Sequence, residues 1–308
     1  MSHLEEALGD YLRLRRSMGF KFKDAECKLT RFVAYMDDIG AETVTMETAL
    51  GFVLDPALDP KSSACFRRLT TVRGFSRYLA GVDARTEILP AGLVSYRPPR
   101  LVPYLYSDED IAAIVHYARA STSFPFRRET LTTMIGLLAV TGMRVGEAIH
   151  LNRSEVDWDQ AVILVRDTKF RKGRDVPVSP STIEALAAYV RRRDRTRPVT
   201  TRLFVSLAGT EVAYNYFRET FRNAVTAARI GVGLPSPPRV HDLRHSFAMR
   251  TLLGWYRAGL DVEALLPRLS TYLGHRAPRF TYTYFTATPE LLGHAVARRE
   301  AAEEEEAP

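Results

Sequence analysis

The chain has few cysteines and no long apolar run. Its two cysteines, Cys27 and Cys65, are too few for a disulfide framework and lack the spacing of a zinc site. No stretch of 18 or more apolar residues occurs, which argues against a membrane span. The first residues also lack the apolar core of a secretory signal peptide. These absences favour a reducing, cytoplasmic setting and no membrane partner.

Lysine is also scarce. The 308 residues include only six lysines, and residues 101–299 contain just two of them, Lys169 and Lys172. That segment nevertheless carries 28 basic and 18 acidic residues, because arginine is abundant, whereas residues 1–100 carry 15 and 13. A net charge of +7 and a pI near 9.5 favour a polyanionic partner. Charge alone does not distinguish such a partner from a well-solvated surface.

Length and hydrophobic periodicity predict two domains. In residues 1–100, apolar residues recur with helical spacing over about 4–12, 29–36 and 61–80, which indicates a small helical bundle. Residues 92–107 contain three prolines and no clear period, as in an extended linker. We therefore predict an amino-terminal domain over 1–100, a second domain over 101–299 and a disordered acidic tail over 300–308.

The second domain is also predicted to be mostly helical. Ser107, with Asp110 three residues later, is typical of a helix start. Two runs rich in β-branched residues within 161–179 flank Arg171-Lys172-Gly173, which predicts a hairpin and thus a small antiparallel sheet. The expected helices cover about 108–119, 128–140, 181–194, 211–229, 242–258 and 262–273.

Two segments carry basic residues in positions suited to phosphate chemistry. In TGMRVGEAIHL, Gly142 fits a helix end, Arg144 follows at a bend, and Glu147 is placed to hold its guanidinium. An ordinary ion pair is the simpler reading of that motif. Lys169 and Lys172 lie on the predicted turn, where a lysine can donate a proton that arginine would keep, although two lysines on a turn are also compatible with chance.

Two later segments add histidines and a tyrosine. In HDLRHSFA, His241 and Arg244 are three residues apart at a predicted helix start and share a face, whereas His245 is expected to point elsewhere. His275 follows a Leu-Gly turn, and Tyr284 lies nine residues further on. Core packing is the alternative for the tyrosines here, and each motif is a weak signal on its own.

Taken in order, these motifs resemble the tyrosine recombinase, or phage integrase, family in its Xer-like bacterial branch. The matching stretches are TGMRVGEAI, TKFRKGRDVP, HDLRHSFA, LGH and the tyrosine nine residues after that histidine, and they cover about 107–290. The resemblance implies a helical, SAM-like core-binding domain, followed by a mostly helical catalytic domain of the DNA breaking-rejoining fold with its small sheet.

The resemblance implies a nucleophile and a phosphate grip. Tyr284 would attack a scissile DNA phosphate and give a 3′-phosphotyrosyl link and a free 5′-hydroxyl. Arg144 and Arg244 would hold the non-bridging oxygens, as forked guanidinium groups do well. Lys169 would protonate the departing 5′-oxygen. Lys172 is the rival for that role, and here Thr168 and Phe170 stand where the family turn has glycines.

The remaining implied roles belong to His241 and His275, which would bond the phosphate and assist proton transfer, and to Glu147, which would orient Arg144. Tyr282 is the rival nucleophile, but the spacing from His275 favours Tyr284. The stretch between His245 and His275 is several residues longer than in the compact Xer pattern.

The family pattern further implies that neither ATP nor a metal is needed. The expected partner is double-stranded DNA with inverted half-sites, bound by a homotetramer on two sites or by a hetero-assembly with related recombinases, in the cytoplasm at the nucleoid. The segment after Tyr284 would pack on a neighbouring protomer or, alternatively, on its own. Candidate DNA contacts are Arg67, Arg68, Arg73, Arg77, Arg171, Lys172, Arg174, Arg191, Arg192 and Arg193.

Two other functions use overlapping features. A catalytically silent DNA-binding relative would occupy a site without cutting it, although all six expected catalytic residues are present. A type IB topoisomerase shares the phosphate chemistry but relaxes supercoils without a partner site. A metal-dependent nuclease is less well supported, because no carboxylate cluster accompanies the histidines.

Overall fold

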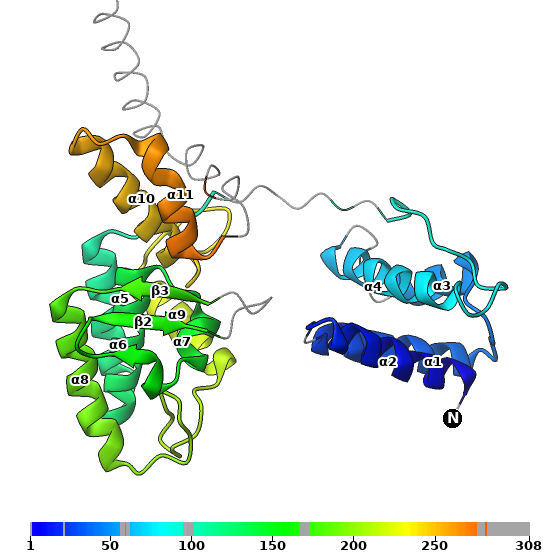
Figure 1. Cartoon of the computed structure of the whole chain (residues 1–308), viewed down its shortest axis with the longest axis horizontal. Coiled ribbons are helices and arrows are strands. Elements are labelled where there is room, and N and C mark those ends of the chain that lie inside the picture. Colours follow the sequence, from blue (N-terminus) through cyan, green and yellow to red (C-terminus); the bar gives the residue numbers. More distant parts are fainter. Residues whose placement is uncertain are drawn as a thin grey trace, which may run out of the picture. The chain divides into compact units, whose positions relative to one another are not determined.

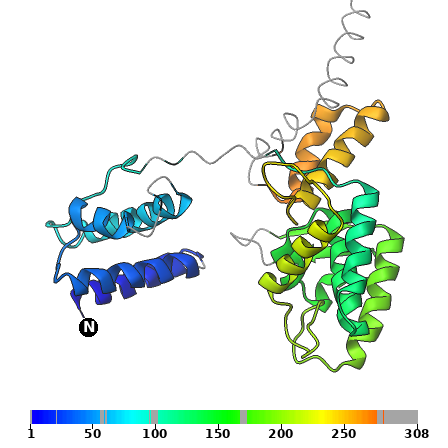
Figure 2. The same ribbon diagram turned by 180° about the vertical axis from the view of Figure 1, so that it is seen from behind.

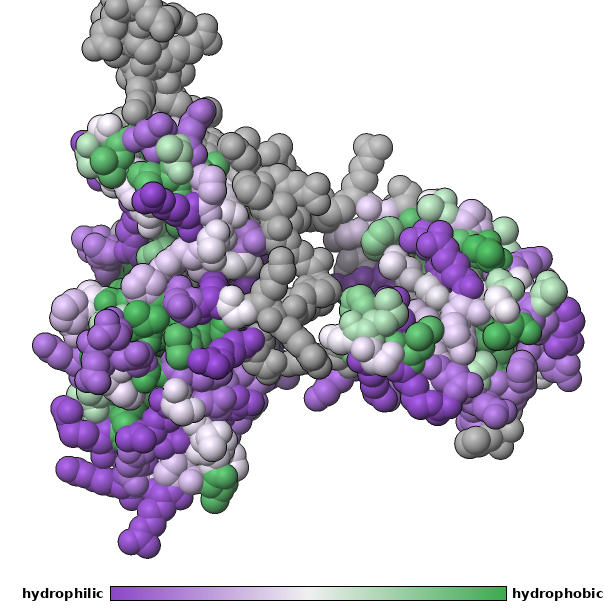
Figure 3. All heavy atoms as spheres, in the orientation of Figure 1, coloured by the Kyte–Doolittle hydropathy of each residue, from purple (hydrophilic) through white to green (hydrophobic). Residues whose placement is uncertain are grey.

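The computed structural model describes residues 2–20, 22–55, 59, 62–94, 96, 102–166, 173–275 and 281. The chain divides into two compact units, Met1–Arg100 and Leu101–Pro308 (Figure 1). The described residues are mainly helical, with one small antiparallel sheet, as predicted. None of their helices is both long and apolar enough to cross a membrane. In the view of Figure 3 the surface is mostly hydrophilic, with small hydrophobic patches.

The described residues of the first unit form a bundle of four helices. They are α1 (His3–Ser17), α2 (Lys23–Asp38), α3 (Met46–Val53) and α4 (Ser63–Leu79). The apolar stripes predicted on α1, α2 and α4 form its core, in which Phe32 and Phe75 are fully buried. Helix α3 was not predicted, because its eight residues are too few to show a period. A capping box between Thr45 and Thr48 defines where it starts.

The second unit contains the predicted helices, with ends shifted by a few residues. Its elements are α5 (Asp108–Ala120), α6 (Pro125–Thr141), α7 (Val145–His150), the 3-10 helix η1 (Arg153–Glu155), β1 (Val156–Asp157), β2 (Val162–Val165), β3 (Arg174–Pro177), α8 (Pro180–Arg195), α9 (Tyr214–Ala227), α10 (Asp242–Arg257) and α11 (Val262–Leu273). Helix α6 begins earlier than predicted because Pro125 occupies its first turn, where the fixed φ of proline suits a helix.

The sheet packs one face into the core. Its order is β1-β2-β3, all antiparallel, and Ile163 pairs with Val156 on one side and Val176 on the other. All three side chains are buried. The predicted hairpin is therefore β2–β3, and β1 is a strand that the sequence did not reveal. The hairpin tip, with Lys169, Arg171 and Lys172, lies outside the described residues.

Helix α6 is central to this unit. It packs against α5, α7, α8 and α10, and Figures 1 and 2 show these helices gathered around it. Helix α11 contacts both α10 and β3. This packing brings together the end of α6, the start of α10 and the end of α11, the three places at which the sequence motifs lie.

Candidate active site

Two glycine turns place the first motif residues. Helix α6 ends at Gly142 and α11 ends at Gly274, each with a left-handed backbone (φ 60° and 66°). A side chain at Gly142 would also meet Phe247, since an added Cβ would lie 2.7 Å from its Cδ1 atom. The turns redirect the chain so that Arg144 starts α7 and His275 follows α11 directly.

The guanidinium of Arg144 is held on one side and accessible on the other. Its Nη1 donates to Glu147 Oε1 at 2.7 Å, and its Nη2 donates to the Gly274 carbonyl at 3.1 Å. The backbone N–H of Arg144 donates to Glu147 Oε2 at 2.9 Å. The Arg144 side chain remains 41% exposed, so a ligand can reach it. Glu147 thus contacts Arg144 in the way the family pattern implies.

Arg244 is fixed more deeply. It lies on α10, is only 2% exposed, and donates to the Gly142 carbonyl at 2.8 Å and to the Leu273 carbonyl. His241 immediately precedes α10, at the helix start that the HxxR spacing predicted. Although part of its surface is open, the surrounding protein lowers the pKa of His241, and the Arg244 guanidinium lowers it further.

His245 lies beside His241 rather than pointing away from it, which corrects the sequence-based expectation. The two rings meet edge to face with their centroids 5.1 Å apart, because residues four apart share a helix face. Burial, followed by the effect of His241, lowers the pKa of His245 to about 4. His241 therefore has an uncharged neighbour at neutral pH.

His275 is held by a contact at one of its ring nitrogens. Its Nδ1 is 2.8 Å from Oγ1 of Thr281, a fully buried residue that the sequence did not single out. Burial, and then the guanidinium groups of Arg244 and Arg144, lower the pKa of His275 to about 4. The imidazole is therefore neutral at physiological pH, and the Thr281 contact holds the ring at its Nδ1 atom.

A second arginine grips Glu147. Arg174 donates from Nη1 to Oε1 at 3.0 Å and from Nη2 to Oε2 at 2.8 Å, and both side chains are less than a tenth exposed. Burial alone would raise the pKa of Glu147, but the hydrogen bonds from Arg174, supported by those from Arg144, lower it to about 2. Glu147 is thus a carboxylate at any physiological pH.

The three arginines also close the end of one helix. Arg174 Nε donates to the Tyr272 carbonyl at 2.6 Å, Arg244 donates to the Leu273 carbonyl, and Arg144 donates to the Gly274 carbonyl. The last carbonyls of a helix have no partner within it and form its negative end, so cations are stabilising there. Three consecutive carbonyls at the end of α11 therefore hold the positive groups around His275.

Comparison with known proteins decides the family. The model of the phage integrase family matches residues 105–290, which include every motif assembled above. The chain belongs to the phage integrase family. Among its relatives, the candidate integrase/recombinase y4rB of Sinorhizobium fredii is 39% identical over 97% of this chain and 98% of its own length. The tyrosine recombinase XerC of Rhodospirillum centenum is 30% identical over 76% of this chain and 67% of its own.

Solved structures show the same fold at lower identity. The Tn1549 transposon integrase in complex with a circular intermediate DNA matches with a TM-score of 0.65, at 16% identity over 97% of this chain and all of that one. The XerH recombinase bound to its palindromic difH substrate matches with a TM-score of 0.64, at 18% identity over 89% of this chain and 78% of that one. The likeness to these structures confirms the fold class predicted from the sequence.

Two predicted DNA contacts are wrong. Arg174 is buried, and its guanidinium is committed to Glu147 and the Tyr272 carbonyl. Arg193 is 4% exposed and donates to the carbonyls of Thr200 and Arg202 at 2.9 Å. Both lie in arginine-rich stretches, where buried and exposed arginines look alike in the sequence.

The other predicted site residues remain predictions. Arg68 is partly buried against the Phe52 carbonyl and Asp55, and Arg192 pairs with Glu129. Arg67, Arg77 and Arg191 are exposed, and Arg73 is half-buried. Tyr284 and its rival Tyr282 lie outside the described residues, as do the residues of the hairpin tip.

Proposed function

We propose that this phage integrase family member is a site-specific DNA recombinase that cuts and rejoins DNA through Tyr284. The observation that carries the proposal is the convergence of Arg144, Arg244, His241 and His275, from three separate elements, around the ends of α6 and α11. Two fixed guanidinium groups beside two neutral imidazoles suit a phosphodiester that gains negative charge as it reacts.

The cleavage step exchanges one phosphate ester for another. The phenolic oxygen of Tyr284 bonds to phosphorus while the bond from phosphorus to the 5′-oxygen breaks. A phenol with a pKa of about 10 needs a base or a cationic pocket before it attacks. His241 and His275 are neutral because their pKa values are lowered, so one of them takes up the phenolic proton as the new ester bond forms, and the other hydrogen-bonds the phosphate.

Arg144 and Arg244 stabilise the charge on the non-bridging oxygens, and Lys169 delivers a proton to the departing 5′-oxygen. Attack by the 5′-hydroxyl of a second strand on the phosphotyrosine reverses the step. Because the covalent link keeps the energy of the broken ester, the proposed route uses neither ATP nor a metal ion.

The proposed substrate is duplex DNA with inverted half-sites, which places the activity at the nucleoid. Two observations support it. The chain carries an excess of positive charge, and the matched Tn1549 integrase and XerH structures are of DNA complexes. A homotetramer on two sites is the assembly we propose, with related recombinases as the alternative partners.

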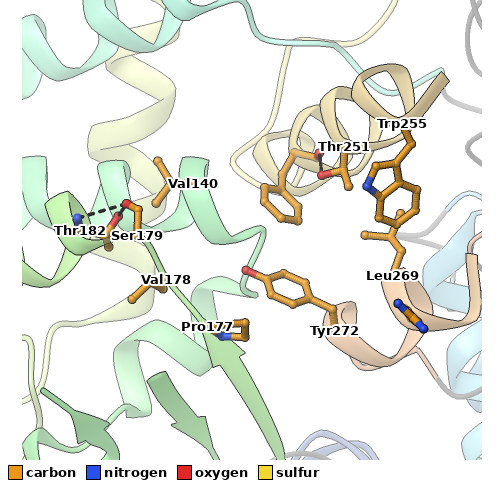
Figure 4. Close-up of a pocket in the computed structure, with 11 residues that line it drawn as sticks. Val140, Pro177, Val178, Ser179, Thr182, Thr251, Trp255, Leu269 and Tyr272 are labelled. Atoms are coloured by element: carbon orange, nitrogen blue, oxygen red, sulfur yellow. Dashed lines mark hydrogen bonds between the residues drawn. The ribbon is translucent and has the colours of Figure 1, made fainter. Parts of the chain in front are cut away.

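An apolar groove supports this assembly. It measures about 400 Å³ and lies between α6, the start of α8, α10 and α11, as Figure 4 shows. Val140, Phe247, Trp255, Leu269 and Tyr272 give it an apolar lining. Residues 286–299 repeat apolar side chains at helical spacing, with Leu291, Leu292 and Val296 on one stripe. We propose that this carboxy-terminal segment of a neighbouring protomer fills the groove.

The nucleophile is tested with a matched pair of tyrosine variants. The recombination site is first recovered from the DNA that flanks the coding sequence, by trapping covalent complexes and sequencing them. On a nicked suicide duplex of that site, the wild type and Tyr282→Phe should form a covalent complex that survives denaturation, and Tyr284→Phe should form none. Trapping by Tyr284→Phe at the wild-type level would contradict the proposal. Relaxation of plasmids that lack the site would instead favour a topoisomerase.

A further inference from the structure

We propose that Arg174 is a positioning residue for DNA cleavage, which sets Arg144 through Glu147 and sets the end of α11 that carries His275. The inference rests on the proposed function and deepens it. The sequence suggested a surface DNA contact for Arg174, but its burial and its partners point to a role inside the protein.

Arg174 links three elements through one side chain. From the first position of β3, its two terminal nitrogens fork onto both carboxylate oxygens of Glu147 on α7. Its Nε donates at 2.6 Å to the Tyr272 carbonyl near the end of α11. Glu147 in turn fixes Arg144, because the same two oxygens accept hydrogen bonds from the side chain and the backbone N–H of Arg144.

The geometry specifically requires arginine. A guanidinium presents its donors in a flat fork that satisfies a carboxylate and a carbonyl at the same time, whereas an ammonium group is a single point of charge on a flexible stem. The pair is also buried, with 7% and 8% of the two side chains exposed. Removal of one member of such a pair leaves an uncompensated charge in a medium of low dielectric constant.

The absence of a side chain at Gly274 leaves room for the Arg174 guanidinium. A Cβ built on Gly274 would lie 2.9 Å from Arg174 Nη1 and 3.2 Å from its Cδ and Cζ. The guanidinium therefore lies directly beneath the turn that connects α11 to His275. Because Arg174 contacts both this turn and Glu147, a displacement of Arg174 would move Arg144 and His275 together.

Arg174 also lies close in sequence to the proposed general acid. Lys169, the proposed general acid, is five residues before Arg174, in the segment that joins β2 to β3. Arg174 is thus the point at which this segment returns to the sheet, and it is bonded to the residue that orients Arg144.

A second buried arginine provides the control. The side chain of Arg193 is about as buried as that of Arg174 and also donates to backbone carbonyls, but its partners are Asp194, Thr200 and Arg202. None of them belongs to the arginine–glutamate cluster. Substitutions of Arg193 therefore report what the loss of a buried arginine does to this fold in general.

The experiment compares Arg174→Lys and Arg174→Met with Arg193→Lys and Arg193→Met in the full chain. It measures the rate of covalent trapping on the nicked duplex between pH 5 and 8, affinity for the intact duplex, and the folded fraction. We expect Arg174→Met to lower the trapping rate about 100-fold and Arg174→Lys about tenfold, as for a reacting group displaced by about 1 Å. Affinity should change by less than about threefold, and the Arg193 variants should trap at nearly the wild-type rate per folded molecule.

The pH profile separates positioning from mere stability. Among the residues that the structure describes, the charged groups that face Glu147 are Arg174 from β3 and Arg144 from the start of α7. Without Arg174, burial still raises the pKa of Glu147 while the strongest opposing contact is gone, so its carboxyl should take up a proton as the pH falls. Trapping by Arg174→Met should therefore decline from pH 8 to 5 more steeply than in the wild type or the Arg193 variants.

The possible results distinguish a positioning role of Arg174 from a purely structural one. If Arg174→Met does not fold, Arg174→Lys still decides, because it keeps the charge and loses the fork. Wild-type trapping by a folded Arg174→Lys, or losses that track the folded fraction with an unchanged pH profile, would overturn the positioning role alone. A wild type that traps no DNA would overturn the proposed function and this inference with it.

Discussion

His275 differs from a surface histidine because of its surroundings. Burial and the nearby guanidinium groups of Arg244 and Arg144 lower its pKa to about 4, so it is uncharged at neutral pH. A neutral imidazole has one protonated nitrogen and one acceptor, and the partner of one nitrogen fixes the role of the other. The Thr281 hydroxyl, 2.8 Å from Nδ1, can donate to this nitrogen or accept from it, and in either case it holds the ring in one orientation.

At the residue scale, we predict that Thr281→Val slows covalent trapping on the nicked duplex about fivefold, the effect of losing one hydrogen bond of about 1 kcal/mol. Thr281→Ser keeps the hydroxyl and should trap at close to the wild-type rate. Single-turnover trapping at neutral pH measures both variants. Equal rates for the valine and serine variants would show that the hydroxyl does not orient His275.

At the scale of single elements, the helix ends matter most. Helix α6 stops at Gly142 because its φ of 60° suits glycine and because Phe247 fills the space that a side chain would need. Gly136 lies inside the same helix, and an added Cβ there meets nothing within 4 Å. A side chain would therefore be tolerated at Gly136, within α6, but not at Gly142, which ends the helix.

We predict opposite effects on stability for alanine at these two positions. Gly142→Ala should lower the free energy of unfolding by about 1–3 kcal/mol, through backbone strain and overpacking against Phe247. Gly136→Ala should raise it by about 0.5–1 kcal/mol, the usual gain of alanine over glycine within a helix. Urea unfolding monitored by circular dichroism measures both, and shifts of the same sign would contradict this explanation.

The sequence predicted elements whose signals are local. The glycine turns at Gly142 and Gly274, the start of α10 at His241 and the β2–β3 hairpin all depend on neighbouring residues, and the structure contains them. Helix α3 and strand β1 escaped prediction because eight and two residues are too short to show a period.

The buried side of the site was not predictable in the same way. Arg174 lies in an arginine-rich stretch that reads as a solvated turn, and its burial depends on Glu147, 27 residues earlier, and Tyr272, 98 residues later. The Thr281 contact with His275 is closer in sequence, but no motif specifies it. The predicted residues came from a family resemblance, whereas their supports come from packing.

At the scale of the whole molecule, the groove of Figure 4 and the carboxy-terminal segment should act between protomers. We predict that a chain ending at residue 287 still binds one site and traps it covalently, but fails to join two sites in one complex. Val140→Glu, which places a charge at the groove, should fail in the same way with its own segment intact. Light scattering of the DNA complexes measures the assembly, and unchanged assembly of the shortened chain would contradict a role between protomers.

The three carbonyls at the end of α11 make the site cooperative. Each anchors a different guanidinium, so a single unwound turn would release all of them together instead of weakening one at a time. We therefore expect covalent trapping to be lost on gentle heating before the rest of the helical unit melts.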